Sequence, residues 1–473
     1  MIMNIYDVIG FIGVFIVFVP QTLFFLSHAF FYALSRKYKS AQEYIGEVYN
    51  RTVSFITPVR NEPLEYVEGL LDYVSKLGLP NYEIIIVSDD EEETKNKLLE
   101  KVSNWRNMGY NVWFVWRAKP IGYKSGALNV GLYASKGDFV FPLDVDCRPE
   151  KCLIGKGIGI MLKDPSIAGV VGRWEPIDIT ERLAQAVGLA MKTMVEILFK
   201  GRSVLGLSVF PLGTGTVFNS EILKKEVKGW DPARIQDDME IGCRLMSRRF
   251  RIMYLDGCKA YVEVPNTYKG LRIQQARWAY GATDVFISRF KEIVKSPQRV
   301  IGKIEASMFL LQYLPAMLAF LGTGMLALIS ILSGIEYLGR HYYILILWLT
   351  AESVYAAILY HEIRDIVRNS WKTIVNLGRN AAIVTALTPH LSWSMIQAFA
   401  RVKITYKRTP KGRFEYLAFT RRVPTEFLTG LLFLALSIIL FAKELTLTGI
   451  WVLMQSLGFL YVTFRWPNDV FRK

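Results

Sequence analysis

The stretches VSFITPVRNE (residues 53–62), EIIIVSDD (83–90) and FVFPLDVD (139–146) share one pattern, an apolar run that ends in polar residues. Helical stretches lie between them. Continuous apolar strands that alternate with helices are typical of an α/β fold with a parallel sheet. In such sheets ligands bind beyond the carboxyl ends of the strands. The sequence therefore predicts an α/β domain with its site at the edge where these polar residues gather.

Long uncharged segments flank this region on both sides. Among the 473 residues, 52% are hydrophobic, and segments 8–35 and 306–335 contain no Lys, Arg, Asp or Glu. Each is longer than the roughly 20 residues that cross a bilayer. The first is too long for a secretory signal peptide, the alternative interpretation, and lacks a small-residue cleavage site. Three further candidates, which bring the expected spans to five, are residues 342–360, 427–442 and 447–464.

The formal net charge of +15 raises the possibility of a nucleic-acid partner. The basic residues, however, cluster beside apolar segments, as in 35–39 and 401–413. That distribution follows the positive-inside rule. We therefore expect no nucleic acid, a cytoplasmic soluble domain and an N-terminus outside. The segment at about 373–400 has basic loops on both sides, which predicts an interfacial helix.

The domain boundaries follow from these segments. We expect an N-terminal transmembrane helix at 1–38, a soluble domain at 39–300 and a second membrane region at 301–473, with no regulatory domain after the last span. The four cysteines have no paired metal-ligand spacing, which predicts neither a zinc site nor a disulfide. They are Cys147, Cys152, Cys243 and Cys258.

Asp144 and Asp146 follow an apolar strand directly. Closely spaced carboxylates at a strand end can hold a divalent cation against a diphosphate. A solvated turn is the alternative, because Asp-x-Asp triplets are common by chance.

Other motifs accompany this pair in a fixed order. They are Thr57–Glu62, Asp89–Asp90, Lys124–Gly131, Gln236–Asp238, Gln274–Trp278 and Tyr406–Gly412. Together they resemble the family 2 glycosyltransferases of the cellulose synthase and hyaluronan synthase type. The resemblance covers about residues 55–281 and reaches the membrane half through 406–412. It implies a GT-A-like catalytic domain inserted between α-helical transmembrane segments.

For the donor, the resemblance implies that Asp89 and Asp90 bind the uracil and ribose side of a UDP-sugar. Carboxylates suit this task because they accept hydrogen bonds from ring N–H groups and sugar hydroxyls. A solvated acidic turn is the alternative for 90–93. Glu62 and Lys124 fall in the matching nucleotide-pocket motifs. Asp146, assisted by Asp144, is expected to bind Mg²⁺ or Mn²⁺.

The resemblance also implies a catalytic base. The family motif is Thr-Glu-Asp, whereas this chain has Gln236, Asp237 and Asp238, so Gln replaces Thr, Asp replaces Glu, and only the last residue is unchanged. We expect Asp238 to deprotonate the acceptor hydroxyl, with Asp237 as the alternative. Direct displacement inverts the anomeric configuration and predicts a β-linked product.

The acceptor side is implied by a Gln-x-x-Arg-Trp motif. Trp278 is expected to stack on the acceptor sugar and Arg277 to meet the diphosphate, although a core Trp and a surface Arg are the alternative. Gln274 belongs to the same motif, and Gly213 and Thr214 to an acceptor-contacting turn. Thr409 and Lys411 match the gating loop of cellulose synthases, expected at 403–414. A positive-inside loop that touches lipid headgroups is the alternative.

The predicted function is a family 2 inverting hexosyltransferase of the plasma membrane that builds, and translocates, a β-linked polysaccharide. Its partners would be a UDP-sugar, a growing glycan or lipid acceptor, and membrane lipid. One alternative is a lipid glycosyltransferase of the ceramide glucosyltransferase kind, which adds a single sugar. The other is a non-enzymatic scaffold or transporter, and retention of Asp146, Asp238 and Arg277 argues against it.

Overall fold

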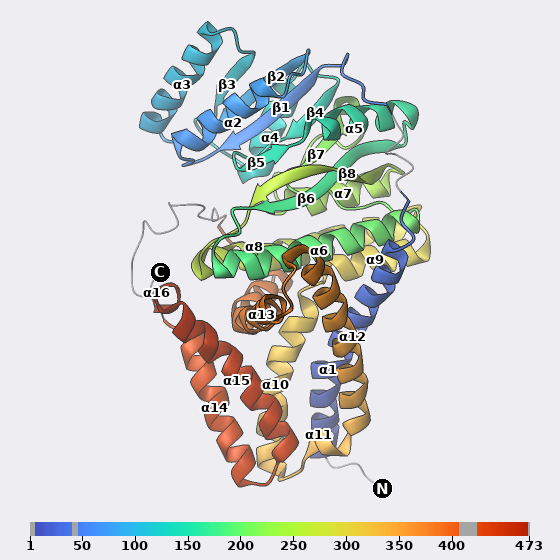
Figure 1. Ribbon diagram of the computed structural model, residues 1–473, viewed down its shortest axis with the longest axis vertical. Coiled ribbons are helices and arrows are strands. Elements are labelled where there is room, and N and C mark those ends of the chain that lie inside the picture. Colours follow the sequence, from blue (N-terminus) through green and yellow to red (C-terminus); the bar gives the residue numbers. More distant parts are fainter. Residues whose placement is uncertain (1–4, 40–45, 406–422, 472–473) are drawn as a thin grey trace.

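The computed structural model describes residues 5–39, 46–405 and 423–471. A sheet covered by helices forms one end of the molecule, and a bundle of long helices forms the other (Figure 1). Three helices lie across the boundary between the two ends: α6 (Arg182–Val204), α8 (Tyr268–Lys295) and α13 (Ser370–Phe399).

The sheet has eight strands in the order β3-β2-β1-β4-β7-β6-β8-β5. Its first four strands are parallel, which confirms the α/β pattern predicted for the amino-terminal half. They are β1 (Val53–Val59), β2 (Tyr82–Ser88), β3 (Val112–Trp116) and β4 (Phe139–Pro142). Strands β1, β2 and β4 are almost wholly buried, as expected where helices cover both faces of a sheet.

The other half of the sheet is mixed. Strand β7 (Thr216–Asn219) is antiparallel to β4 and to β6 (Ile167–Ile177), whereas β6 runs parallel to β8 (Arg251–Glu263). The short β5 (Cys147–Pro149) is antiparallel to β8. The chain therefore returns directly from β4 to the far edge, and Asp144 and Asp146 lie in the connection between these two strands.

Two apolar layers hold the helices on the sheet. On one face, α2 (Leu64–Lys76), α3 (Glu92–Asn107) and α5 (Lys151–Lys163) share one buried cluster with the strands. The second cluster contains α4 (Tyr123–Ala134), α7 (Asp237–Ser247) and the π-helical turn η2 (Ile222–Glu226). Phe199 of α6 joins this second layer, so a boundary helix is part of the domain core.

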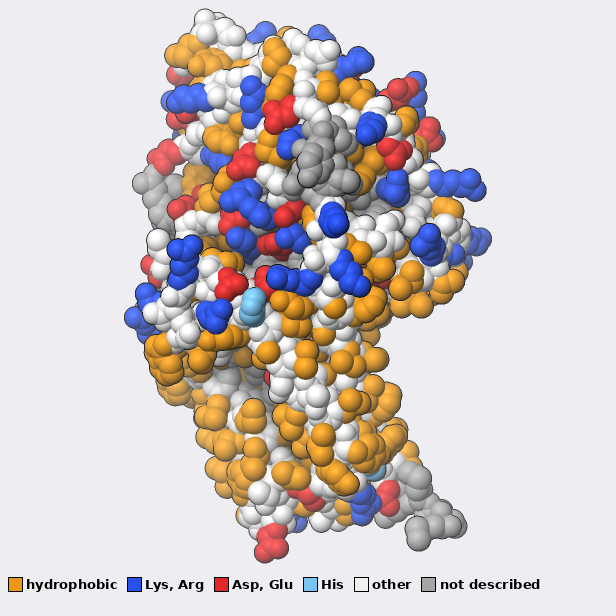
Figure 2. Space-filling view, turned by 45° about the vertical axis from the view of Figure 1, so that its right-hand side comes forward, with side chains coloured by type: hydrophobic (Ala, Val, Ile, Leu, Met, Phe, Trp, Pro, Cys, Tyr) orange, Lys and Arg blue, Asp and Glu red, His pale blue; other side chains and the backbone are white. Residues whose placement is uncertain are grey.

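Among the described residues, five helices are long and apolar enough to cross a membrane. They are α1 (Ile5–Ser35), α10 (Leu314–Ser333), α12 (Tyr342–Val367), α14 (Thr425–Ala442) and α15 (Thr446–Arg465). Hydrophobic side chains cover this end of the molecule, while charged side chains gather around the sheet (Figure 2). The number of five agrees with the sequence. The predicted span 306–335 is shorter, because α9 (Val300–Leu310) ends before α10 begins.

The boundary helices join the two ends through packing. One buried cluster contains residues of α1, α6, α8, α10, α12, α13, α14 and α15. The segment expected to be interfacial forms α13, a helix of 30 residues with Pro389 in its interior. Short helices α11 (Tyr337–Arg340) and α16 (Pro467–Phe471) complete the described chain.

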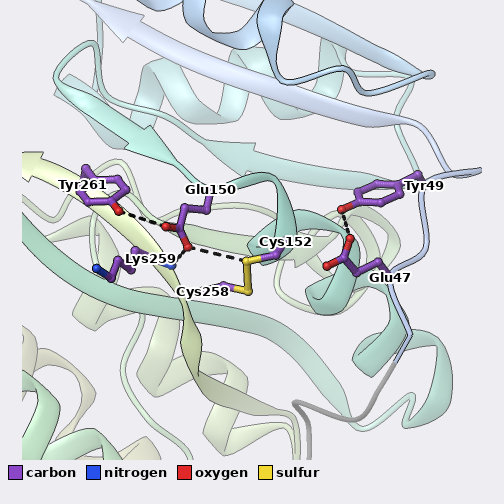
Figure 3. The surroundings of a disulfide bond; sticks show 7 residues. All are labelled: Glu47, Tyr49, Glu150, Cys152, Cys258, Lys259 and Tyr261. Carbon is purple, nitrogen blue, oxygen red and sulfur yellow. Dashed lines mark hydrogen bonds between the residues drawn. A yellow bond between two sulfur atoms is a disulfide. The ribbon is translucent and has the colours of Figure 1, made fainter.

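The sequence prediction of no disulfide was wrong. Cys152 of α5 and Cys258 of β8 are bonded, with their Cα atoms 5.9 Å apart (Figure 3). Pairing of β5 with β8 brings these residues together across 106 positions of sequence, which no local spacing reveals. Beside the bond, the Glu150 carboxylate accepts hydrogen bonds from Lys259 N and the Tyr261 hydroxyl, at 2.8 and 3.0 Å. Cys147 and Cys243 are free and buried.

Because this disulfide closes a loop of about 106 residues, its reduction should destabilise the protein by about 5 kcal/mol on the chain-entropy model. We expect Cys258→Ser to lower the apparent melting temperature measured by tryptophan fluorescence. Cys243→Ser, in a buried free cysteine, is the matched control. Thiol titration of the unfolded chain should find two free cysteines before reduction and four after it. Four thiols before reduction would contradict the bond.

Candidate functional site

A cavity of about 790 Å³ lies between the sheet and the helix bundle. It begins at the carboxyl ends of the parallel strands, where the segments that follow β1, β2 and β4 contribute to its wall. This is the edge that the sequence predicts for ligand binding. The predicted site residues that line the cavity are Glu62, Asp89, Lys124, Asp144, Asp146, Gly213, Thr214, Asp237, Asp238, Gln274, Arg277 and Trp278.

The two neighbouring aspartates after β2 have different positions. Asp89 lines the cavity and forms a two-point ion pair with Arg117, at 2.6 and 2.5 Å. Asp90 is buried and is not among the described residues that line the cavity; its carboxylate accepts from Asn61 N and from the Ser88 hydroxyl. Asn61 has a left-handed φ of 53°. Asp90 therefore supports the loop after β1, and Asp89 is the one of the two that borders the cavity.

Arg117 was missed by the sequence analysis. Its side chain also donates to the carbonyls of Ile121 and Tyr123, at 2.9 and 3.0 Å. It thus ties Asp89 to the turn before α4. A basic residue directly after β3 is the signal that could have revealed it, since the carboxyl ends of β2 and β3 are adjacent.

That turn is tightly built. Gly122 and Tyr123 both have left-handed φ angles, 78° and 48°. The left-handed region is costly for a residue with a Cβ, and such strain persists only where the surrounding structure enforces it. A Cβ on Gly122 would lie 2.3 Å from the side chain of Pro232, so the turn packs against the segment that leads to α7. The turn aims the next residue, Lys124, into the cavity.

Lys124 connects the two groups of carboxylates. Its Nζ lies 2.8 and 3.0 Å from the two carboxylate oxygens of Asp144, and it donates to the Gly213 carbonyl at 2.9 Å. The nearest oxygen of Asp237 is 3.8 Å away. One ammonium group therefore offsets negative charge on both sides of the cavity.

Asp146 lies deeper than Asp144 and is only 3% exposed. Its surroundings include Tyr66, whose hydroxyl donates to Glu263 at 3.2 Å. Burial and the negative charges of Glu263 and Asp146 raise the pKa of Tyr66 to about 12. The Thr214 hydroxyl accepts from Asp144 N at 3.3 Å, which holds the turn at 213–214 against this segment. Among the described residues no group of three His, Cys, Asp or Glu has the geometry of a metal site.

The two carboxylate oxygens of Asp238 differ in their contacts: Oδ1 accepts hydrogen bonds, whereas Oδ2, here called open, accepts none within the described chain. Its Oδ1 accepts hydrogen bonds from Gln236 Nε2 and Met239 N, both at 2.7 Å. Within the described chain its Oδ2 accepts none, and a Cβ on Gly213 would lie 3.4 Å from it. Burial raises the pKa of Asp238, and its two donors and the charges of Lys124 and Arg277 oppose that shift. Burial also raises the pKa of Asp237.

Helix α8 forms the side of the cavity nearest the bundle. Gln274, Arg277 and Trp278 all line it, so the motif predicted for the acceptor comes together as one face. Gln274 is 8% exposed, and no described residue bonds to its Oε1. On the same helix Gln275 accepts from the Tyr313 hydroxyl at 3.0 Å. Thr409 and Lys411, assigned to a gating loop, lie outside the described residues.

The cavity continues into the helix bundle, which the sequence analysis did not predict. This second part, here called the bundle chamber, is formed by α1, α6, α12, α13 and the start of α10. Aromatic and amide side chains are mixed with apolar ones along its wall. Its aromatic and amide members include Gln21, Phe24, Phe25, Gln312, Tyr313, Tyr355 and Asn380, and its apolar members include Met191, Met194, Leu387 and Leu391.

Comparison with known proteins places the chain in a family. Residues 54–225 match the model for glycosyl transferase family 2, and residues 166–360 match that for glycosyl transferase family group 2. Over 453 residues the chain is 31% identical to a probable glycosyltransferase of Sulfolobus acidocaldarius, an alignment that covers 94% of this chain and 96% of that protein. The chain belongs to glycosyltransferase family 2. The predicted enzyme class is thereby confirmed.

More distant relatives of this glycosyltransferase are plant enzymes. It is 29% identical over 254 residues to glucomannan 4-beta-mannosyltransferase 7 of Arabidopsis thaliana, covering 50% of this chain and 44% of that one. Among solved structures it is similar to the mannosyltransferase PcManGT of Pyrobaculum calidifontis in complex with GDP-Man and Mn²⁺. That similarity has a TM-score of 0.56 at 14% identity and covers 84% of this chain and all of the other. The predicted GT-A-like fold is confirmed.

The strained turn before α4 predicts that no residue larger than glycine fits at position 126 without a shift of the backbone. A Cβ on Gly126 would lie 1.9 Å from the carbonyl oxygen of Ile121, so Gly126→Ala must displace backbone. Overpacking of this kind costs about 1–3 kcal/mol. We expect a lower apparent melting temperature by tryptophan fluorescence. Gly378→Ala in α13, where a Cβ meets nothing within 4 Å, is the control and should not destabilise. Equal melting temperatures would contradict the geometry of the turn.

Proposed function

We propose that this protein is a membrane-embedded, inverting hexosyltransferase that extends a β-linked glycan from a nucleoside-diphosphate sugar and passes the product into its membrane region. The observation that carries the proposal is the continuous cavity. Charged groups suited to a sugar nucleotide line one end of it. The bundle chamber, suited to a glycan, lies at the other end, and Asp238 lies between them.

At the donor end, Asp89 and Glu62 offer carboxylates to the nucleoside, and Lys124 and Arg277 offer positive charge to the diphosphate. The sequence motifs favour a uridine nucleotide. The mannosyltransferase PcManGT is in complex with GDP-Man, which makes a guanosine nucleotide an equally direct candidate. The donor is therefore proposed to be a nucleoside-diphosphate hexose, with uridine or guanosine as its nucleoside.

A divalent metal fits the residues at 144–146. Mg²⁺ and Mn²⁺ prefer oxygen ligands, and Mg²⁺ in phosphate-transferring sites is held by one or two carboxylates together with substrate phosphates. Asp144 and Asp146 provide two such carboxylates on one cavity wall. The lack of a third acidic or histidine ligand among the described residues is compatible with a site that the diphosphate completes. When bound, the metal would neutralise charge on the departing nucleoside diphosphate.

Asp238 is proposed as the general base. Its open Oδ2 faces the cavity near Gly213, where an acceptor hydroxyl can donate its proton. The hydroxyl oxygen then attacks the anomeric carbon from the side opposite the leaving diphosphate. This direct displacement inverts the configuration and converts an α-linked donor into a β-linked product. Gln236 and Met239 N hold Oδ1 and so fix the orientation of the carboxylate.

The acceptor is proposed to enter the bundle chamber past Trp278. Aromatic faces stack on the C–H surfaces of sugars, and amides bond to their hydroxyls. Both kinds of side chain line the chamber. Its apolar residues, such as Met191 and Leu387, are the specific observation that favours a second candidate, a lipid acceptor that receives a single sugar.

The orientation in the membrane is also a proposal. Basic residues lie on the side of the sheet domain at the ends of α1 and α12. Arg36, Lys37 and Lys39 follow α1, and Arg364 and Arg368 lie at the end of α12. This arrangement favours a cytoplasmic catalytic domain at about 39–300 and an external N-terminus in the plasma membrane. The membrane regions would be 1–38 and 301–473.

The decisive experiment incubates protein in lipid nanodiscs with UDP-glucose, UDP-N-acetylglucosamine or GDP-mannose and Mg²⁺ or Mn²⁺. We expect one donor to give nucleotide release and a series of products spaced by one hexose, measured by mass spectrometry. Asp238→Asn should slow the reaction about 10²–10⁴-fold. Asp72→Asn, in an exposed i,i+4 ion pair, is the control. A single sugar on lipid would replace the glycan acceptor in the proposal, and no turnover with any donor would refute it.

The pH dependence follows from the raised pKa of Asp238. A base acts only when ionised, so kcat/KM should fall as the pH drops through that raised value, above the ordinary carboxyl pKa of about 3.9. Gln236→Leu removes a donor that stabilises the ionised form and should move this acid limb to higher pH. Gln185→Leu on α6 is the control and should leave the limb in place. An unmoved limb in Gln236→Leu would contradict the assigned base.

A further inference from the structure

Lys124 occupies the position at which a metal would have to bind Asp144. Its Nζ is within 3.0 Å of both carboxylate oxygens of Asp144. The side chains are 15% and 31% exposed, so water screens this pair only partly. A metal that binds either oxygen of Asp144 would have to share it with, or displace, a positively charged ammonium group. Lys124 and a divalent cation therefore compete for the same carboxylate.

The lysine is held in this position from three directions. Its backbone follows the left-handed pair Gly122 and Tyr123, which fixes where the side chain starts. Its Nζ donates to the Gly213 carbonyl, and the carboxylate of Asp237, 12% exposed, lies 3.8 Å away. These contacts bring one ammonium between the segment at 144–146 and the start of α7. The contact between Lys124 and Asp144 is therefore fixed by the surrounding backbone and side chains.

A nucleoside diphosphate changes this competition. Its phosphate oxygens can accept the Lys124 ammonium as ion-pair partners and can also supply ligands to the metal. Both effects release Asp144 from the lysine in favour of the metal. Linkage makes this effect reciprocal. The nucleotide must raise the affinity for the metal by the same factor by which the metal raises the affinity for the nucleotide.

We propose that Lys124 is an internal counter-cation that blocks Asp144 until a nucleoside diphosphate arrives, so that metal and nucleotide bind as an obligatory pair. The inference rests on the proposed function for its ligands but concerns binding order, not turnover. Its consequence is a site that is closed to free divalent cations and opens only to a metal–nucleotide complex.

The test measures free Mn²⁺ by electron paramagnetic resonance with the whole protein in lipid nanodiscs, with no sugar donor. In the wild type, Mn²⁺ alone should bind weakly, and saturating UDP or GDP should raise its affinity at least tenfold, within the usual range of coupling between ligands. Wild type that binds Mn²⁺ equally tightly with and without either nucleotide would overturn the proposal, and this measurement depends on no variant.

Lys124→Met keeps the length of the side chain and removes its charge. It should bind Mn²⁺ alone at least tenfold more tightly than wild type, and UDP or GDP should then raise its Mn²⁺ affinity by a smaller factor than in wild type. Lys124→Arg retains the positive charge and should remain weak without nucleotide. Lys192→Met is the matched control, because Lys192 is 13% exposed and pairs with Glu175 at 2.6 Å outside the predicted metal site. It should behave as wild type.

The outcomes separate this proposal from the proposed function. If Lys124→Met binds Mn²⁺ alone no better than wild type while nucleotide still promotes binding in both, the role of Lys124 is refuted and the metal site remains. If no protein binds Mn²⁺ even with UDP and GDP, both the metal site and the role of Lys124 are refuted. Transfer from a sugar nucleotide without added metal would then show that the glycosyltransferase proposal survives.

Discussion

Two pairs of aspartates, one after β4 and one at the start of α7, line the wall of one cavity, and much of the surrounding structure serves to keep them there. They are Asp144, Asp146, Asp237 and Asp238. Two like charges about 5 Å apart repel by about 3 kcal/mol at an effective dielectric constant of about 20. Burial adds to this cost, as the raised pKa values of Asp237 and Asp238 indicate. The arrangement can persist only with nearby positive charge and hydrogen-bond donors, and Lys124 and Gln236 supply them.

This constraint explains why distant segments converge on the site. Lys124 comes from the turn before α4, Asp144 from the end of β4, and Asp238 from the first turn of α7. Gln236 packs against Gly281 of α8, where a Cβ would lie 2.7 Å from its own Cβ. Gln236 thus packs against α8 at a position where the helix has no side chain. In this position its Nε2 donates to Asp238 Oδ1.

The parallel half of the sheet could be predicted because its pattern is local. Apolar runs between helices, each ending in polar residues, determine β1, β2 and β4 and the edge at which their ligand groups meet. What could not be predicted depends on contacts between remote segments. Asp89 and Asp90 are adjacent in sequence, yet only the course of the backbone turns one toward the cavity and the other toward Asn61. The disulfide depends on the pairing of β5 with β8, and the bundle chamber on how α1, α6, α12 and α13 pack.

The membrane helices are part of the site because the boundary helices belong to both ends of the molecule. Leu183 and Val187 of α6 and Leu271 and Ala279 of α8 are buried in the cluster that holds the spans together. Other residues of α6 and α8, among them Met191 and Trp278, line the cavity. Arg272 of α8 also lies 3.4 Å from the fully buried Glu426 at the start of α14. Breaking a buried ion pair is strongly destabilising. The pair of Arg272 and Glu426 therefore opposes separation of α8 from α14. The face that carries Gln274, Arg277 and Trp278 is therefore positioned by the bundle as much as by the sheet. A fragment limited to residues 39–300 would keep the carboxylates and α8 but lose the bundle helices that hold α8 in place before them.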